Sequence, residues 1–183
     1  MNADNVAHAG HKTTFVMQSG KEAGSITLML MRLGTRWFGL DVRAIEEVAL
    51  KGVVTRVPTS PNHILGVTSL RGRLVTVVGL EQMIGGDGLL SRESTATLPR
   101  LVVVRDGDYE MAVVAEGIHG MTEHVPATDP EAVRSPDRPA FVREEFDWQG
   151  NRVSLLDAPL LIATAARQAG SLALSEGSEG MGA

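Results

Sequence analysis

The sequence predicts an all-β protein made of two similar β units and closed by a short C-terminal helix. Short apolar segments bounded by Gly, Asp and Pro recur along the chain, a pattern typical of small β structures. Hydrophobic residues make up 43% of the 183 residues but aromatic residues only 4%, so Val, Leu, Ile and Met must fill the core. Such a core suits narrow barrels. The third observation is an internal repeat between the two halves.

The domain is expected to span residues 25–169, as two intertwined β-barrel subdomains with boundaries near residues 85–100 and 145–150. Residues 1–24 mix small and polar residues without periodicity, and residues 170–183 are rich in Ser, Gly and Glu. Both are predicted to be disordered. The Gly-rich stretch Gly85–Pro99 is predicted to be a long connection between the barrels.

The first strands form a predicted hairpin. Ile26–Met31 is apolar on both faces, and a turn at Gly34-Thr35 returns the chain into a second strand, Trp37–Val42. We expect Trp37 in the core, because a chain with few Phe residues needs bulk there.

The next predicted turn, Ser69-Leu70-Arg71-Gly72, precedes a strand with no polar side, Leu74–Val78. Such a strand is expected to be buried on both faces. Gly72 can adopt a positive φ, and the permanent charge of Arg71 needs a partner.

Arg71 has two alternative roles. It either satisfies backbone carbonyls at the turn before Gly72, or it lines a partner site in an ion pair with Glu47 or Asp41. Glu47 lies on the same side of an extended strand as Ile45, so it is either a solvated edge charge or a partner of Arg71 beside an apolar groove. One exposed ion pair contributes only about 0–1 kcal/mol to stability, so recognition would make better use of it.

The second half repeats the design of the first. Its hairpin consists of Leu101–Val104, a turn at Asp106-Gly107-Asp108, and Tyr109–Ala115. The aligned segments are Phe38–Ile45 with Met111–Ile118 at an offset of 73 residues, Gly72–Val78 with Gly150–Leu156 at an offset of 78, and Val57-Pro58 with Val125-Pro126. Three matches in the same order predict an internal duplication.

Helix signals are confined to two places. Asp157 can cap a helix that begins at Ala158-Pro159 and stops at Gly170. Its packed face is expected to contain Leu160, Leu161, Thr164, Ala165 and Gln168. A one-turn helix at Glu81–Ile84 would be its counterpart in the first half.

Composition and motifs argue against catalysis. The chain has no Cys, which excludes disulfides and thiolate chemistry and fits a reducing cytoplasm. The spacing of His119 and His124 fits no metal pair, and we expect both in exposed loops. There is no nucleophile elbow and no phosphate-binding loop. We therefore predict no catalytic residue, no metal and no cofactor. The net charge of −5 disfavours nucleic acid, and no apolar run is long enough to cross a membrane.

The stretch Gly66-Val-Thr-Ser-Leu-Arg-Gly, followed by an apolar strand, resembles the CheW family of bacterial chemosensory adaptors. Phe38–Val48 and Val57-Pro58 support the resemblance, which covers Ser25–Arg167. It implies two five-stranded SH3-like β-barrels in a pseudo-duplicate arrangement, the first interrupted by the second, so that the N- and C-terminal parts lie together.

The resemblance also implies partners: the cytoplasmic tip of a methyl-accepting chemoreceptor and the regulatory domain of a CheA-type histidine kinase. The protein would be a cytoplasmic monomer without enzymatic activity, recruited to receptor arrays. The implied receptor groove contains Ile45, Glu47, Val48, Arg71, Gly72, Val113 and Val114. The implied kinase-facing end of the first barrel contains Thr55, Val57, Ile64, Leu65 and Gly66.

Two departures from the family pattern are expected to loosen one strand end: Gly79 stands where aspartate is usual, and Thr76 where proline is usual. Alternative functions are a CheW-like module that occupies array positions without activating a kinase, or one that serves a non-flagellar motility or developmental pathway. A small β-barrel enzyme and an oligonucleotide-binding barrel are disfavoured, because polar catalytic groups and stacking aromatics are missing.

Overall fold

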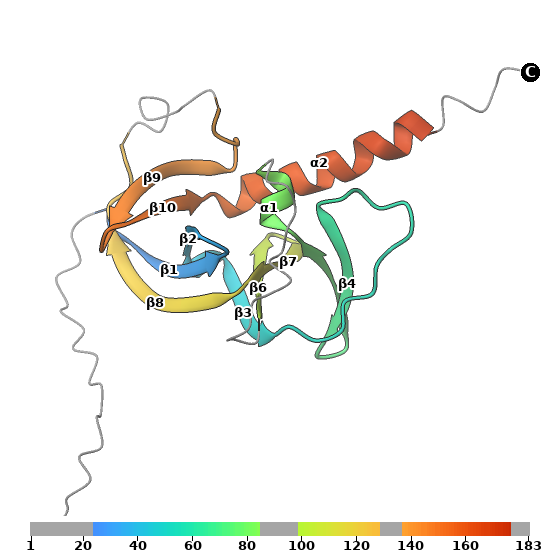
Figure 1. Cartoon of the computed structure of the whole chain (residues 1–183), viewed down its shortest axis with the longest axis horizontal. Coiled ribbons are helices and arrows are strands. Elements are labelled where there is room, and N and C mark those ends of the chain that lie inside the picture. Colours follow the sequence, from blue (N-terminus) through green and yellow to red (C-terminus); the bar gives the residue numbers. More distant parts are fainter. Residues whose placement is uncertain (1–23, 85–98, 129–136, 177–183) are drawn as a thin grey trace, which may run out of the picture.

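The computed structural model describes residues 24–84, 99–128 and 137–176 (Figure 1). The predicted N-terminal arm, apart from Gly24, lies outside these residues. So do most of the predicted Gly85–Pro99 connection and the end of the predicted tail.

Short strands dominate the described part of the chain, as predicted. The elements are β1 (Ile26–Leu33), β2 (Arg36–Asp41), the 3-10 turn η1 (Val42–Ala44), β3 (Ile45–Leu50), β4 (Ile64–Leu70), β5 (Arg73–Val78), α1 (Leu80–Met83), β6 (Arg100–Asp106), β7 (Tyr109–Ala115), β8 (Gly117–His124), β9 (Val142–Trp148), β10 (Asn151–Leu156) and α2 (Ala158–Glu176). No helix among the described residues has the length and apolarity needed to cross a bilayer.

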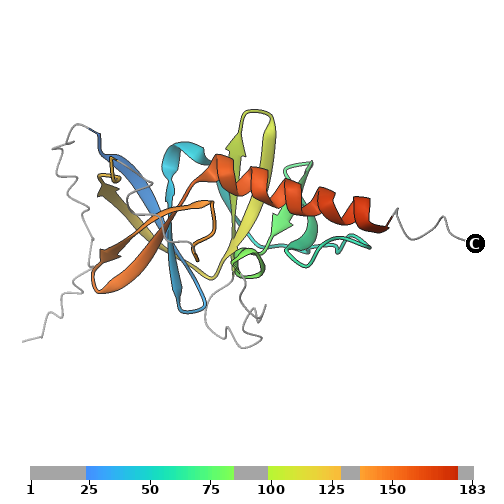
Figure 2. The same cartoon turned by 90° about the horizontal axis from the view of Figure 1, so that it is seen from above.

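The strands form two five-stranded mixed sheets that lie side by side (Figures 1 and 2). Sheet A has the order β8-β1-β2-β10-β9, and sheet B has the order β3-β6-β7-β5-β4. Neighbouring strands are antiparallel except for β2 with β10 and β5 with β7, which are parallel. This arrangement confirms the predicted fold class, with the N- and C-terminal strands together in sheet A.

The two repeats exchange strands. β1 to β5 form the first repeat and β6 to β10 the second, but each sheet combines the first two strands of one repeat with the last three of the other. The strand registers follow the same offsets as the sequence. Leu155 pairs with Gly39 in sheet A, and the equivalent residues Val77 and Ala112 pair in sheet B. The internal duplication is therefore confirmed at the level of individual residue pairs.

The core is aliphatic, as the composition predicts. The interior of sheet B contains Val75, Val77, Leu101, Val103, Ala112 and Val114, whereas a larger cluster between the sheets includes Phe38, Leu80, Val104 and Leu161. The prediction that β5 is buried on both faces is wrong at its start. Leu74 is 76% exposed, because the central core covers only the later part of this strand.

Helix α2 crosses from sheet A over sheet B, where it contacts β6 and β7 (Figure 2). Asp157 caps it as predicted, since its Oδ1 accepts a hydrogen bond from the backbone N–H of Leu160 at 2.9 Å. The predicted stop at Gly170 is wrong, because the helix continues to Glu176. The predicted packed face also needs correction. Leu160 and Gln168 are exposed, and the buried residues are Ala158, Leu161, Ile162 and Ala165.

Helix α1, the predicted one-turn counterpart, carries a poorly solvated acid. Burial and the nearby charge of Glu116 raise the pKa of Glu81 above its ordinary value of 4.5, against a smaller opposing effect of Arg36. Among the described residues, Glu81 Oε2 is buried without a hydrogen-bond partner. Glu116 is itself buried, where Oε2 accepts a hydrogen bond from the backbone N–H of Gly34 at 3.1 Å.

We expect Glu81→Gln to raise the melting temperature at pH 7. When the pKa of a carboxyl group is higher in the folded state than in the unfolded state, the folded state loses stability as the pH rises above the unfolded-state pKa. Removing the charge therefore removes that cost. The gain should shrink toward pH 4, where the wild-type carboxyl is protonated, and melting curves between pH 4 and pH 8 would measure it. A gain that is equal at both ends of this range would contradict the assignment.

Candidate functional site

The turn between β4 and β5 places Arg71 at the tip of a hairpin. Arg71 has φ 50° and Gly72 has φ 81°, so both central residues have the positive φ of a type I′ turn. Arginine has no advantage in this conformation, which favours Asn and Gly. The equivalent turn of the second repeat has the same geometry with Gln149-Gly150, at φ 48° and 78°. The fold therefore does not require an arginine at this turn.

The Arg71 side chain is 82% exposed and is attached at one point. Its Nε lies 3.1 Å from Glu47 Oε2, and its terminal nitrogens make no hydrogen bond or ion pair with the residues that the structure describes. Of the two predicted partners, Glu47 is confirmed and Asp41 is wrong, because Asp41 instead binds Arg43 two residues away. That contact raises the pKa of Arg43. Most of the Arg71 side chain is therefore exposed to solvent.

Glu47 belongs to a chain of ion pairs that crosses the end of sheet B. The contacts, in order, are Arg71 Nε to Glu47 Oε2 at 3.1 Å, Glu47 Oε1 to Arg73 Nη2 at 3.5 Å, Arg73 Nη1 to Glu110 Oε2 at 2.5 Å, Glu110 Oε2 to Arg105 Nη2 at 3.2 Å, and Arg105 Nε to Glu46 Oε2 at 3.2 Å. We call these six residues the ion chain. Its two inner carboxylates are largely buried, with Glu47 12% and Glu110 19% exposed.

Strand β3 supplies apolar surface next to the ion chain. Its side chains alternate as predicted, with Ile45, Glu47 and Ala49 partly buried and Glu46, Val48 and Leu50 exposed. Val48 is 44% exposed and Leu50 54% exposed. The implied groove needs correction at Val113 and Val114, which are buried and support this region from within the sheet rather than line a surface. The accessible residues of this implied set therefore lie on β3 and at the hairpin tip.

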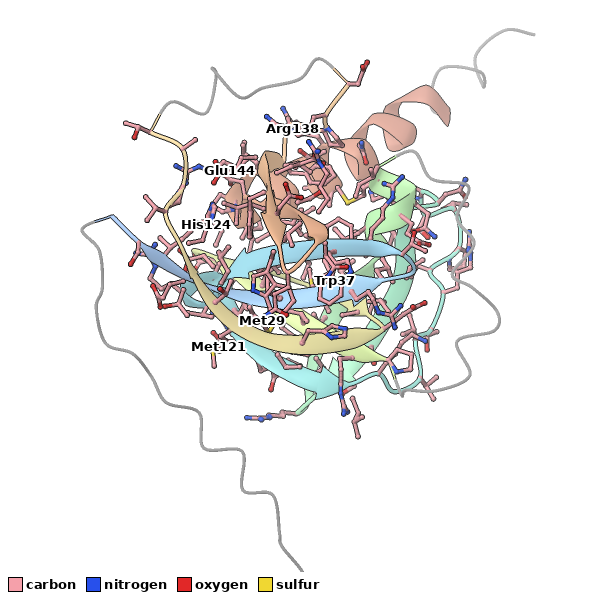
Figure 3. The ribbon with its side chains drawn as sticks, turned by 60° about the vertical axis from the view of Figure 1, so that its left-hand side comes forward. Met29, Trp37, Met121, His124, Arg138 and Glu144 are labelled. Atoms are coloured by element: carbon pink, nitrogen blue, oxygen red, sulfur yellow. The ribbon has the colours of Figure 1, made fainter. Side chains whose placement is uncertain are left out.

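At the equivalent end of sheet A, aromatic rings replace some of these charges, while Arg32 occupies the position of Arg105. Trp37 occupies the position of Glu110, and its ring lies 4.4 Å from His119 and 5.6 Å from Trp148, measured between centroids. The prediction that Trp37 is a core residue is wrong, because this ring is only partly buried at the end of the sheet (Figure 3).

The two histidines lie on strand β8, not in exposed loops as predicted. His124 is partly buried, with Nε2 2.7 Å from Glu144 Oε1, and its ring stacks on Phe146. His124 and Glu144 lie at the opposite end of sheet A from Trp37 (Figure 3). Since they belong to the two edge strands β8 and β9, their contact brings the edges of the curled sheet together.

The second implied site lies at the other end of strand β4. Thr55 and Val57 are exposed, Leu65 is partly buried, and Ile64 and Gly66 are buried. Thr55 forms two backbone hydrogen bonds with Val67, each 2.8 Å long. Ile64, Leu65 and Gly66 lie in β4 of sheet B, and Thr55 pairs with that strand through Val67. The expectation that they lie on the first barrel, the one that contains both ends of the fold, is therefore wrong.

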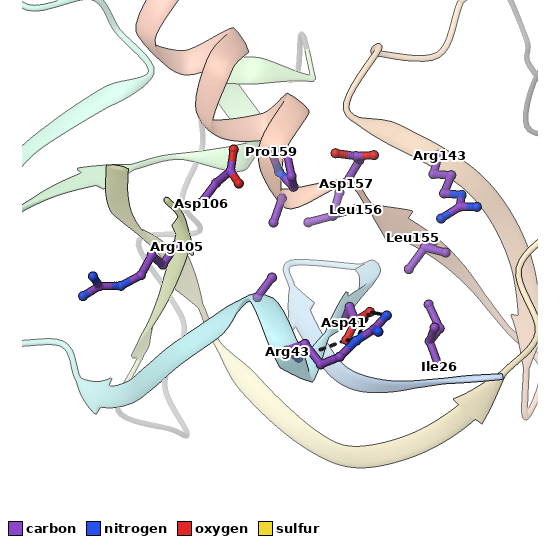
Figure 4. Close-up of a pocket in the computed structure, with 12 residues that line it drawn as sticks. Ile26, Asp41, Arg43, Arg105, Asp106, Arg143, Leu155, Leu156, Asp157 and Pro159 are labelled. Atoms are coloured by element: carbon purple, nitrogen blue, oxygen red, sulfur yellow. Dashed lines mark hydrogen bonds and ion pairs between the residues drawn. The ribbon is translucent and has the colours of Figure 1, made fainter. Parts of the chain in front are cut away.

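Clefts also lie beside these surfaces. One of about 400 Å³ lies at the start of α2 and is lined by Asp41, Arg43, Arg105, Arg143 and Asp157, among others (Figure 4). Much of its charge is already used within the fold, because Asp41 binds Arg43, Arg105 belongs to the ion chain and Asp157 caps α2. A second cleft of about 550 Å³ is lined by Trp37, Arg36, Arg138 and Arg152 among others. Among the described residues, no cluster of three acidic or histidine side chains could hold a metal.

Comparisons with known proteins agree on one family. A family model described as CheW-like domain matches residues 27–166. Chemotaxis protein CheW of Klebsiella aerogenes is 28% identical over 90 residues, which cover 49% of this chain and 52% of that protein. Protein FrzA of Myxococcus xanthus is 29% identical over 99 residues, which cover 54% and 58%. This chain thus spans about half the length of these curated relatives.

A solved structure shares the fold. The crystal structure of scaffolding protein TtCheW from Thermoanaerobacter tengcongensis superposes with a TM-score of 0.60 and 17% identity, over 82% of this chain and 90% of that one.

We expect Gly66→Ala to lower the free energy of unfolding by more than about 2 kcal/mol. Gly66 has φ 143°, and a Cβ atom there would lie 2.2 Å from the backbone oxygen of Thr55. Denaturant unfolding would measure the loss. Gly72→Ala is the matched control, because Gly72 also has a positive φ but no atom lies within 4 Å of the Cβ that alanine would add there. It should cost only about 1–2 kcal/mol of backbone strain. Equal losses would show that contact with Thr55 is unimportant.

Proposed function

This chain belongs to the CheW family, and on that premise we propose that it is a coupling protein that links chemoreceptor tips to the regulatory domain of a CheA-type histidine kinase. CheW-family proteins are adaptors without enzymatic activity. The proposed role is therefore positional: an adaptor that holds two partners together raises their effective concentration without any chemistry. We propose that it acts in the cytoplasm, at membrane-associated receptor arrays.

The exposed guanidinium of Arg71 is the observation that carries the proposed receptor site. Glu47 holds Arg71 through Nε alone, so the terminal nitrogens remain available as a rigid pair of donors. Arginine recognises carboxylates and carbonyls through such a fork. The fold itself uses Gln at the equivalent turn position of the second repeat, so Arg71 is better explained by a partner than by the turn.

Strand β3 supplies the apolar half of the proposed receptor site. Val48 and Leu50 project from the same face, and residues two apart on a strand are separated by about 6.6 Å. Residues four apart on a helix are separated by about 6 Å along its axis. A receptor helix that lies along β3 can therefore place successive apolar residues on Val48 and Leu50 while a polar group reaches Arg71. This is the helix-in-groove mode of recognition.

The proposed kinase site lies around Thr55, Val57 and Leu65, at the far end of β4 from Arg71. Thr55 and Val57 are exposed. Gly66 contributes no side chain, but it lets the backbone of Thr55 lie close to that of β4. Separate ends of one sheet allow both partners to bind at once, which a coupling protein requires.

A second candidate function keeps the same partners but changes the output. The 29% identity to Protein FrzA is close to the 28% identity to Chemotaxis protein CheW of Klebsiella aerogenes. The second candidate is therefore a coupling protein that serves a non-flagellar motility or developmental pathway. The other alternative is a protein that occupies array positions without activating a kinase. Adding this protein to receptor and kinase and measuring autophosphorylation of the kinase tests that alternative.

We expect Arg71→Asn to weaken binding of a receptor-tip fragment by about tenfold or more, because a charged donor at an interface is lost. The fold should keep or gain stability, since Asn-Gly is a preferred type I′ turn. Titration calorimetry with the fragment and thermal melting would measure both.

Gln149→Asn is the matched control, because it makes the same change in the equivalent turn of sheet A. It should leave receptor affinity unchanged. If both variants bind as well as the wild type, Arg71 does not contact the receptor. If Arg71→Asn melts several degrees lower, its role is structural.

We expect Val57→Asp to weaken binding of the kinase regulatory domain while receptor binding stays intact, because a charge replaces an exposed apolar contact at the proposed kinase site. Val125→Asp makes the same change at the equivalent Val-Pro pair of the second repeat and should spare kinase binding. Calorimetry with each partner separates the two sites. Equal loss of both partners in Val57→Asp would contradict the proposed division of surfaces.

A further inference from the structure

The ion chain is present at one of two otherwise equivalent sheet ends. Strand registers agree between the sheets, yet the positions of Glu47, Arg73 and Glu110 in sheet B correspond to Gly120, Asn151 and Trp37 in sheet A. Sheet A therefore closes the same backbone arrangement without these charges. The fold does not require the chain of ion pairs, which indicates that it serves something particular to this end of sheet B.

We propose that Arg73 is a positioning residue for receptor binding: it holds the Glu47 carboxylate in place, and Glu47 in turn aims Arg71 at the partner. This inference rests on the proposed function. It extends the recognition site from the exposed hairpin tip to a less exposed residue, since the Arg73 side chain is 39% exposed and that of Arg71 82%. Glu110 binds Arg73 from the opposite side, and Arg105 in turn binds Glu110.

The exposed fractions of the side chains in the ion chain support these roles for Arg73, Glu47 and Arg71. Arg71 is 82% exposed, Arg73 39% and Glu47 12%, so the exposed group is attached through a largely buried one. A long exposed side chain alone would sample many rotamers, and ordering it on binding costs free energy. A fixed carboxylate on its Nε removes part of that cost before the partner arrives.

The geometry requires an arginine at position 73. One guanidinium nitrogen, Nη1, binds Glu110 at 2.5 Å, and the other, Nη2, reaches Glu47 at 3.5 Å. A planar fork can bridge two carboxylates in this way, whereas a lysine ammonium is a single point charge at the end of a flexible stem. Lysine would preserve the local charge balance but would not hold both carboxylates in one arrangement.

The experiment compares Arg73→Ala and Arg73→Lys with the wild type in the full chain. Arg152→Ala is the control, because it breaks an exposed ion pair in sheet A, Arg152 Nε to Glu145 Oε2 at 2.9 Å. Two readouts are needed: calorimetric affinity for a chemoreceptor cytoplasmic-tip fragment, and the water-exchange rate of the Arg71 Nε–H measured by NMR without any partner.

We expect Arg73→Ala to weaken receptor affinity by about tenfold and Arg73→Lys by several-fold, as for loss of charged interface support. Both should speed exchange of the Arg71 Nε–H, because Glu47 no longer holds it. Arg152→Ala should change neither quantity. A melting curve for each variant confirms that the fold is intact, and Arg73→Lys remains informative if Arg73→Ala does not fold.

The inference is overturned if Arg73→Lys leaves both the exchange rate and the affinity at wild-type values. It is also overturned if exchange speeds up but affinity does not change, because Arg73 would then order Arg71 without consequence for binding. If the wild type itself does not bind the fragment, the proposed function fails. The exchange rate alone then decides whether Arg73 positions Glu47 and Arg71.

Discussion

The structure depends on two parallel strand pairings, β2 with β10 and β5 with β7. Each joins a strand of one repeat to a strand of the other, so neither repeat can complete a sheet from its own five strands. Unpaired backbone groups at the centre of a sheet are costly, and these pairings satisfy them in both sheets. The central core and helix α2 then pack where the exchanged strands meet.

Duplication with exchange leaves two sheets of the same register whose ends can evolve independently. At one end, sheet B carries the ion chain where sheet A carries Trp37 and its aromatic neighbours. At the other end, the backbone of Thr55 approaches Gly66 directly in sheet B. The position equivalent to Gly66 in sheet A is Glu144, which reaches His124 instead. A shared backbone thus supports two chemically different surfaces, which suits a protein proposed to hold unlike partners.

Much of this fold could be predicted from sequence because its signals are local. Apolar segments and Gly-containing turns located the strands and the repeat, and Glu47 was identified as one of two possible partners of Arg71. What depended on tertiary packing could not be predicted. An aligned repeat shows which strands are equivalent but not which ones pair, so the intertwining of the two units was expected from the family resemblance and not from the repeat. Burial of Val113 and Val114, exposure of Leu74 and passage of α2 through Gly170 are likewise decided by distant elements. The contribution of Arg73 gave no sequence signal, because one of its partners, Glu110, lies 37 residues away.

The strand exchange also governs the order in which the protein can form during synthesis. β1 and β2 are made before the other described strands, but β2 lacks its parallel partner until β10, the last of them, has been made. Sheet B is complete earlier, once β6 and β7 join β3, β4 and β5. The growing chain must therefore carry the β1–β2 hairpin without its other two neighbours, β8 and β10, while sheet B assembles, a state that exposes strand edges to wrong pairing. Correct pairing in sheet A therefore depends on keeping these strand edges protected until β8 and β10 have been made.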